Sequence, residues 1–440
     1  MRSSRTLPRL SVTFDDERLV DHAGLVLAST LGERLGLGAL MAEFVALEHH
    51  GANVADKALT VVHGLLAGAD CIDDVDLLRA GATDAVLGHR AVAPSTVGTF
   101  LRAITLGHVR QLDAVSGVLL TRAWAAGGGG GRVVLDVDST LCETYGLLKE
   151  GARKVMRTGR RGYHPVVAAT DGGEVVHARL RRGRTNDGSG AARFVGEALA
   201  RLGRAGATEV VLRADSGFYQ RDVIEACRRR GVRFSVGARM QKGLARAITE
   251  IPEAAWVPID YPYGEGAAVA EIPWRAFGVD ARGHEVSAVE VRVIVRRVPP
   301  SPGLQAPLFP TFSYHPFITD QDGEITALDQ FHREHARVEN VIKDLKDAAG
   351  LAHLPSGCFG ANSAWLVFAT IAHNLARWVG RFGMGEGHRM LKTLRRRVLG
   401  VPGRITCSGR RRTLHLPASW PWAADFTSAL GRLRALPLVT

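Results

Sequence analysis

The chain has 440 residues, which is more than one compact core accommodates, so we expect two or three domains. Its 56 Lys and Arg residues outnumber the 44 Asp and Glu residues, and the net charge of +12 favours a polyanionic partner, nucleic acid before membrane. Because no apolar run of about 18 residues and no apolar signal core are present, and the five cysteines are scattered, we expect a cytoplasmic protein with reduced thiols.

The first part of the chain has helical spacing. Leu27, Leu31 and Leu35 recur at four-residue steps, and residues 93–96 (APST) supply a helix start. We therefore predict a helical domain over residues 1–126 and interpret it as a DNA-binding domain, although the same composition suits any helical bundle. The glycines at 127–131 predict a hinge, because a phosphate-binding loop would follow its strand and add Gly-Lys-Ser/Thr.

A short apolar run at 133–140 (VVLDVDST) then predicts a strand. Side chains alternate along a strand, so Asp136 and Asp138 point to the same face. Two such carboxylates resist burial unless a cation lies between or beside them. A divalent metal is one such cation, and a strand that simply ends at the surface is the alternative.

The elements that follow indicate an α/β catalytic core. Strands are predicted at 163–170, 174–180, 209–214 and 232–236, with helices at 191–202 and 221–230. The order of three strands, helix, strand, helix, strand is typical of a ribonuclease-H-like fold, and a doubly wound fold would alternate strands and helices from its start. We assign the first part of this core to residues 132–240.

The rest of the chain divides into three regions. Residues 241–325 carry strand patterns at 256–259, 267–272, 286–298 and 312–319, which predict a β-rich insertion. A helix over 327–346, within a region 326–356, would complete the core. Residues 357–440 begin with an apolar helix at 364–379 and then become basic, with eleven Lys or Arg residues and only Glu386 acidic between 377 and 412. We predict a helical, basic C-terminal region that contacts phosphates.

Three acidic positions form a plausible metal site in this fold. These are Asp138 (or Asp136) on the first strand, Asp215 after the fourth strand and Glu339 on the late helix. Three carboxylates can hold two Mg²⁺ ions, or Mn²⁺ in their place, roughly 3.5–4 Å apart for phosphodiester chemistry. A zinc site at His332 and His335 is the alternative on that helix, but their spacing matches neither zinc-protease motif.

Several short motifs, weak singly but specific in their order and spacing, run through most of the chain. They are 93–96 (APST), 135–140 (LDVDST), 162–165 (GYHP), 180–186 (LRRGRTN), 212–219 (LRADSGFY), 337–340 (RVEN), 343–346 (KDLK), 362–365 (NSAW) and 372–378 (AHNLARW). In these motifs the chain resembles the DDE transposases of the insertion-sequence 1380 family, within the insertion-sequence 4 superfamily. The resemblance implies cut-and-paste transposition by Mg²⁺-dependent cleavage at terminal inverted repeats. It also favours Asp138 over Asp136 as first ligand, because the superfamily's first Asp often precedes Ser-Thr.

The late helix departs from the superfamily pattern in two places. The superfamily carries Tyr, Arg and Lys seven before, four before and seven after the glutamate, where this chain has His332, His335 and Lys346. His335 is a weaker cation than Arg at neutral pH, which changes the expected grip on the terminal phosphate but not the triad.

The resemblance and the charge pattern together specify partners and contacts. We expect binding to double-stranded transposon ends and target DNA in the nucleoid, and a homodimer in the synaptic complex. The expected DNA-contacting residues are Lys343, Lys346, Arg395, Arg396, Arg397, Arg410, Arg411 and Arg412. Trp256 and Trp274 in the insertion are candidates for stacking on a flipped base, with a small β-core as their alternative role. The competing functions are a ribonuclease-H-like nuclease without strand transfer and a catalytically inactive, transposase-derived DNA-binding regulator.

Overall fold

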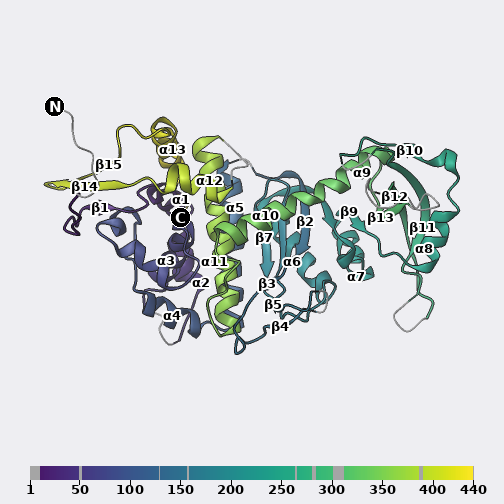
Figure 1. Ribbon diagram of the computed structural model, residues 1–440, viewed down its shortest axis with the longest axis horizontal. Coiled ribbons are helices and arrows are strands. Elements are labelled where there is room, and N and C mark those ends of the chain that lie inside the picture. Colours follow the sequence, from purple (N-terminus) through teal and green to yellow (C-terminus); the bar gives the residue numbers. More distant parts are fainter. Residues whose placement is uncertain are drawn as a thin grey trace.

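The molecule is elongated, with a helical body at one end, a large sheet in the middle and a β-rich extension at the other end (Figure 1). The computed structural model describes residues 10–48, 52–127, 129–155, 158–262, 265–279, 284–300, 312–385 and 390–439. Gly128 in the predicted hinge, and Glu386 and Arg389 in the basic region, lie outside these residues.

The helical body combines both ends of the chain. Its N-terminal helices are α1 (Leu25–Arg34), α2 (Leu37–Phe44), α3 (Val54–Ala67), α4 (Pro94–Ala103) and α5 (Leu106–Gly127), with 3-10 turns at Asp73–Arg79 and Thr83–Val86. The C-terminal helix α11 (Phe359–Trp378) packs against α3, α4 and α5, and α13 (Ala423–Ala435) packs against α1. Because almost every residue of α11 is buried, this apolar helix is the core around which the body is built.

A mixed nine-stranded sheet forms the centre. Its strands are β2 (Gly131–Ser139), β6 (Val166–Thr170), β7 (Val175–Arg179), β8 (Ala207–Ala214), β9 (Arg233–Gly237), β10 (Val257–Pro258), β11 (Ala268–Ala276), β12 (Val289–Val298) and β13 (Ser313–Thr319). The spatial order is β10-β11-β12-β13-β9-β8-β2-β6-β7. Adjacent strands β2, β8 and β9 are parallel, and the other pairings are antiparallel. The strands predicted at 133–140, 163–170, 174–180, 209–214 and 232–236 are therefore confirmed, with small shifts at their ends.

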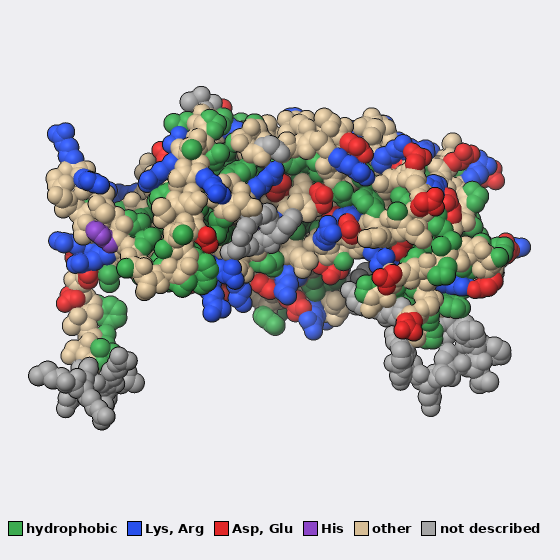
Figure 2. All heavy atoms as spheres, turned by 90° about the horizontal axis from the view of Figure 1, so that it is seen from above, with side chains coloured by type: hydrophobic (Ala, Val, Ile, Leu, Met, Phe, Trp, Pro, Cys, Tyr) green, Lys and Arg blue, Asp and Glu red, His purple; other side chains and the backbone are tan. Residues whose placement is uncertain are grey.

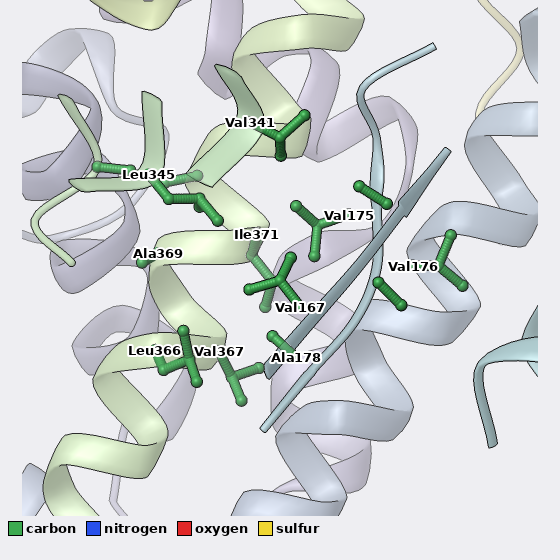
Figure 3. Close-up of a cluster of buried hydrophobic side chains, with 14 of the residues drawn as sticks. Val167, Val175, Val176, Ala178, Val341, Leu345, Leu366, Val367, Ala369 and Ile371 are labelled. Atoms are coloured by element: carbon green, nitrogen blue, oxygen red, sulfur yellow. The ribbon is translucent and has the colours of Figure 1, made fainter. Parts of the chain in front are cut away.

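Helices cover this sheet and join it to the helical body. Helices α6 (Ala191–Ala205) and α7 (Arg221–Arg228) pack together, and α6 contacts β7 and β8. Helix α11 lies against β7, and Val167 of β6 and Val175 of β7 point toward Ile371 (Figure 3). Val341 and Leu345 join the same buried cluster, so the late helix, the sheet and α11 share one core.

The predicted β-rich insertion extends the central sheet and forms no separate one. Strand β13 pairs antiparallel with β9, which would otherwise be the sheet edge, and β12, β11 and β10 follow outward. Helix α8 (Lys242–Thr249) precedes them. The extension is anchored by a small apolar cluster that includes Leu328 of the late helix. The insertion is therefore joined to the core through the β13–β9 pairing and this cluster.

Two expectations about the later chain need correction. The helix expected over 327–346 is interrupted: α9 (Ile325–Arg333) gives way to a 3-10 turn at Glu334–Ala336 and then to α10 (Arg337–Ala348). The C-terminal region is not wholly helical, because β14 (Gly403–Ser408) and β15 (Arg411–His415) form a hairpin that pairs with β1 (Leu19–Val20). Alternation around Ile405 and Leu414 and a turn at Gly409, with φ of 57°, account for it.

The remaining elements are short. A second three-stranded sheet contains β3 (Cys142–Glu143), β5 (Arg161–Tyr163) and β4 (Arg153–Lys154), and α12 (Leu391–Leu394) lies between π-helical turns at Val379–Met384 and Arg395–Leu399. No single helix among those described is both long and apolar enough to cross a membrane. Helices α1 and α2 meet that test only as a pair bent by 60°.

Candidate active site

The three predicted acidic residues come from three elements that meet at one end of the sheet. Asp138 lies near the carboxyl end of β2, and Asp215 directly follows β8, its parallel neighbour. Glu339 lies in the first turn of α10, which contacts β2. Because parallel strands end at the same edge, the order of the sheet brings together residues that are distant in sequence. Asp138 is half-buried, whereas Asp215 and Glu339 are exposed.

The electrostatics of Asp138 show that these carboxylates affect one another. Burial, with smaller contributions from the negative charges of Asp215 and Glu339, raises the pKa of the Asp138 carboxyl to about 6. The Ser139 backbone N–H, at 2.6 Å from Asp138 Oδ1, and His335 oppose that rise. A raised carboxyl pKa indicates negative charge that the protein alone does not neutralise. The donor set, carboxylate oxygens only, is the one that Mg²⁺ prefers.

The spacing of the carboxylates also bears on how many ions they can hold. Within the described residues, the one set of three His, Cys, Asp or Glu residues whose ligand atoms all lie within 4.8 Å is Asp70, Cys71 and Asp74, in the helical body. The oxygens of the predicted triad are therefore spread more widely than this. Mg²⁺ binds oxygen at 2.0–2.1 Å, so ligands of one ion lie at most about 4.2 Å apart. As the side chains stand, a single ion does not reach all three.

Asp136, the alternative first ligand, makes several contacts inside the protein. Arg213 donates two hydrogen bonds to it, Nε to Oδ1 and Nη2 to Oδ2, both at 2.8 Å. His335 Nδ1 lies 2.8 Å from Asp136 Oδ1. The Asp136 side chain is almost completely buried, whereas Asp138 is half-buried and interacts electrostatically with Asp215 and Glu339. These contacts favour Asp138 as the first ligand, which stays a prediction.

The structure adds Asp187, which the sequence did not indicate. Ser139 Oγ donates to Asp187 Oδ1, and His164 Nε2 lies 3.1 Å from the same hydroxyl. A Cβ placed on Gly217 would come within 2.9 Å of both Asp187 Oδ2 and Asp215 Oδ1, so Asp187 lies beside the Asp215 turn. The motif at 180–186 ends one residue before it, but its neighbour Gly188 makes the segment resemble an ordinary turn.

The residues that replace the superfamily's Tyr, Arg and Lys all make internal contacts. His332 stacks on Phe317 with ring centroids 4.2 Å apart and bonds Ser235 at 2.9 Å, and burial holds its pKa well below the usual value. Lys346 Nζ donates to the Leu141 carbonyl at 2.9 Å, just beyond the end of β2. Lys343, one of the predicted DNA contacts, is exposed on α10.

The arginines predicted to bind DNA fall into two groups. Arg395 is a structural residue: it donates to the carbonyls of Leu65, Leu66 and Ala348, and burial lowers its pKa to about 10. The guanidinium of Arg395 is thus engaged inside the protein, and the DNA contact expected of it stays a prediction. Arg397 is half-buried with its guanidinium 5.5 Å from the Trp422 ring centre, whereas Arg396 is exposed.

The other three arginines lie on the surface of the hairpin. Arg410, Arg411 and Arg412 are exposed at the turn and start of β15. The hairpin is at the end of the molecule opposite the β extension, where Lys and Arg side chains gather in Figure 2. Their placement is compatible with the predicted phosphate contacts.

The two tryptophans of the insertion differ. Trp256 is buried, with the Arg297 guanidinium 4.5 Å from its ring centre and Tyr314 packed beside it. Because Arg297 already lies over one ring face, these contacts favour a β-core role for Trp256, and its stacking role stays a prediction. Trp274 is half-buried and lies within hydrogen-bonding reach of the Tyr219 hydroxyl, four residues beyond Asp215.

Comparisons with known proteins show which family the chain belongs to. The family model described as Transposase DDE domain group 1 matches residues 3–438. The chain is also similar to a piggyBac transposase in a cryo-EM structure of its synaptic complex with hairpin DNA, at 10% identity and a TM-score of 0.39, over 86% of this chain and 78% of that one. No curated protein matches the chain.

Proposed function

We propose that this chain, which belongs to the family of transposase DDE domains of group 1, is an active transposase. It would cleave DNA at terminal inverted repeats in a Mg²⁺-dependent reaction and transfer the freed ends into target DNA. The observation that carries this proposal is the placement of Asp138, Asp215 and Glu339 at one edge of the sheet, where the charges of Asp215 and Glu339 add to burial in raising the pKa of Asp138 to about 6. A bound cation would stabilise the charged forms of all three carboxylates.

The finer assignment of fold and family is part of the proposal. The strand order β7-β6-β2-β8-β9, with the first three strands antiparallel and β8 and β9 parallel to β2, supports a ribonuclease-H-like core. The motifs at 135–140, 212–219 and 337–340 carry the three acidic residues, which supports the insertion-sequence 1380 family within the insertion-sequence 4 superfamily.

Two divalent ions fit the residues of this site. Asp138, Asp215 and Glu339 would hold them, and their spacing beyond the reach of one ion favours a pair. When bound, two Mg²⁺ ions supply the Lewis-acid chemistry that activates the attacking oxygen and stabilises the leaving oxygen of a phosphodiester. The chain's own task is to present Asp138 in its ionised form, with its proton released to solvent, and to keep the acidic residues aligned. Asp187, through Ser139, holds the end of β2 in place.

The DNA partner is proposed from charge and placement. The net charge of +12 and the exposed arginines of the β14–β15 hairpin suit a polyanion, while Lys343 lies exposed on the same helix as Glu339. One DNA end would therefore contact both the hairpin end of the molecule and the site. A homodimer in the synaptic complex, which would hold two such ends together, is part of the same proposal.

The proposal is tested by cleavage of end DNA with Mg²⁺. Asp215→Asn and Glu339→Gln should each reduce cleavage by about a thousandfold or more, because metal stabilisation is worth several kcal/mol and about 1.4 kcal/mol is tenfold. Binding of end DNA in a gel shift should remain. The matched control is Asp347→Asn, an exposed carboxylate on the same helix α10, which should cleave normally. Near-normal cleavage by either site variant would contradict the triad.

The same reaction separates the alternatives. A nuclease without strand transfer would release cut ends but leave a supercoiled target plasmid unjoined. An inactive regulator would bind the ends without cutting them. The presence of all three acidic residues at one edge of the sheet favours the catalytic functions over the regulator.

A further inference from the structure

We infer that Asp136, Arg213 and His335 form a buried positioning layer directly beneath the proposed metal site. The inference rests on the proposed function, because it concerns how the three metal-binding carboxylates are held relative to one another. None of the three layer residues is proposed to touch metal or DNA.

The spacing along the chain pairs each layer residue with one carboxylate. Asp136 precedes Asp138 by two residues on β2, and side chains two apart on a strand share a face. Arg213, on β8, precedes Asp215 by two residues, and Asp215 directly follows that strand. His335, in the 3-10 turn before α10, precedes Glu339 in the first turn of that helix by four residues. Each layer residue therefore lies two or four residues before one of the carboxylates.

The first part of the layer joins the two strands. Asp136 and Arg213 are partners in the register of the parallel pair β2 and β8. The guanidinium forms a fork with two 2.8 Å bonds, one to each carboxylate oxygen of Asp136. Both side chains are buried, with exposed fractions of 0% and 2%. A two-bond fork between planar groups fixes distance and orientation together, which a single bond does not.

The second part joins the helix to that fork. Arg213 Nη1 donates to the Phe331 carbonyl at 2.6 Å, and its guanidinium lies 4.7 Å from the Phe331 ring centre. His335 Nδ1 lies 2.8 Å from Asp136 Oδ1. These contacts all fall at the break between α9 and α10, where the chain passes through a 3-10 turn. The direction of α10, and hence the position of Glu339, is therefore set by the same two buried charges.

Stability alone is a poor explanation for such a layer. A buried ion pair can usually be replaced by apolar residues of similar size with little loss of stability, because the pair must first be removed from water. Metal ligands, in contrast, need positions accurate to about half an ångström. Groups that orient metal ligands from behind typically change metal affinity by 10–100-fold when they are removed. The layer has the placement of such groups on all three elements at once.

The test replaces the fork by apolar residues in the full-length protein. In Asp136→Leu/Arg213→Met we expect a melting temperature near that of wild type and unchanged binding of end DNA. Binding of Mn²⁺ to the DNA-free protein, measured from the free Mn²⁺ signal by electron paramagnetic resonance, should weaken by 10–100-fold, and cleavage should fall at least as much. Mn²⁺ binding is a readout that a purely structural pair would not change.

A second buried ion pair provides the matched control. Arg296 and Asp329 are 2.7 Å apart with exposed fractions of 12% and 0%, and they join β12 to α9 away from the carboxylates. Arg296→Met/Asp329→Leu should keep wild-type Mn²⁺ affinity. The inference is overturned if the layer variant also keeps its Mn²⁺ affinity within twofold, or if the control loses as much as the layer variant.

A conservative variant decides the matter if the double variant does not fold. Arg213→Lys keeps the charge but loses the fork, so we expect a folded protein with about tenfold weaker Mn²⁺ binding. Wild-type Mn²⁺ affinity in that folded variant would overturn the inference. Failure of the inference is distinct from failure of the proposed function. The proposed function is judged by cleavage in Asp215→Asn and Glu339→Gln and not by any layer variant.

Discussion

Asp138 combines two properties that oppose each other in a metal-free protein. It is half-buried beside two further carboxylates, which disfavours its charge, yet only its charged form binds a cation. The neighbouring Asp136 shows the opposite solution, since Arg213 and His335 neutralise it internally. Two aspartates on the same strand face therefore differ because only one has a cation built into the fold.

We predict that Asp138→Asn stabilises the metal-free protein while abolishing cleavage. The folded pKa of about 6 exceeds the usual unfolded value of about 3.9, so the folded protein binds more protons between these pH values. Wild-type stability should consequently fall as pH rises from about 4 to 6, and the variant should lack this loss. Above that range the variant should be more stable by roughly 1–3 kcal/mol, since one pKa unit corresponds to about 1.4 kcal/mol.

Thermal melting in EDTA from pH 4 to 8 measures this difference. The asparagine can still accept the Ser139 N–H bond, so little else should change. Asp215→Asn is the comparison, because Asp215 is exposed and its loss should raise the melting temperature less. A melting temperature for Asp138→Asn below that of wild type at pH 8 would contradict the prediction.

At the scale of elements, the strands and the acidic helix follow from local pattern. Runs such as residues 133–137 are apolar and β-branched, so their strand character is visible without any partner. The distinction between Asp136 and Asp138 is not visible in this way, because both alternate onto one face. It depends on Arg213, which lies on another strand and becomes a partner only through the register of β2 with β8. Pairing across strands is the information that a local pattern lacks.

Other differences at this scale have the same origin. Arg395 belongs to a basic run and was expected at a surface, but its position on a turn beneath α3 directs it to three carbonyl groups. Trp256 was expected to be a candidate for stacking, but Arg297 from a neighbouring segment covers its ring. The β extension was expected as an insertion, and its union with the central sheet depends on the open edge of β9. In each case the position of the residue or segment depends on tertiary contacts, which the composition does not specify.

The packing of α1 against α3 yields a prediction for acid sensitivity. His63 of α3 is 2% exposed, lies 3.1 Å from Ser29 Oγ of α1 and stacks with His89. Burial, with a contribution from His89, lowers its pKa to about 3. The unfolded chain, with an ordinary value near 6.5, binds more protons below that pH. Stability from this group is thus complete above about pH 6.5 and is lost as pH falls toward 3.

Unfolding by urea at several pH values between 7 and 4 would measure this effect. One proton taken up on unfolding gives a slope of about 1.4 kcal/mol per pH unit in the free energy of unfolding. His63→Gln should remove most of the slope that this histidine contributes. His353→Gln, at an exposed histidine, should leave the slope as it is in wild type. Equal slopes for His63→Gln and wild type would show that other groups account for the acid sensitivity.

At the scale of the whole molecule, the exposed arginines of the hairpin and the proposed metal site lie in different places. The proposed metal site is in the central sheet, whereas the exposed arginines of the β14–β15 hairpin are at the end formed by the helical body (Figures 1 and 2). The hairpin pairs with β1, and α13 packs against α1, so the C-terminal region and the N-terminal helices belong to the same body. A DNA end that reaches the carboxylates would run along the molecule toward this hairpin. The hairpin would then contribute to the affinity for DNA and not to its cleavage.

This separation predicts how salt affects DNA binding. Each phosphate contact releases condensed counterions and contributes a slope of about −0.9 to the log–log dependence of affinity on salt. Arg410→Ala/Arg411→Ala/Arg412→Ala should therefore make the slope shallower by about 2–3 while cleavage at saturating protein remains.

Arg395→Ala should behave differently: its slope should equal that of wild type, but the protein should lose about 1–3 kcal/mol of stability because three carbonyl bonds are removed. Titrations of labelled end DNA over a range of KCl concentrations, with melting temperatures of the same samples, measure both effects. An unchanged slope in the hairpin variant would show that these arginines are only a solvated surface, and a changed slope in Arg395→Ala would show that this buried residue does reach the DNA.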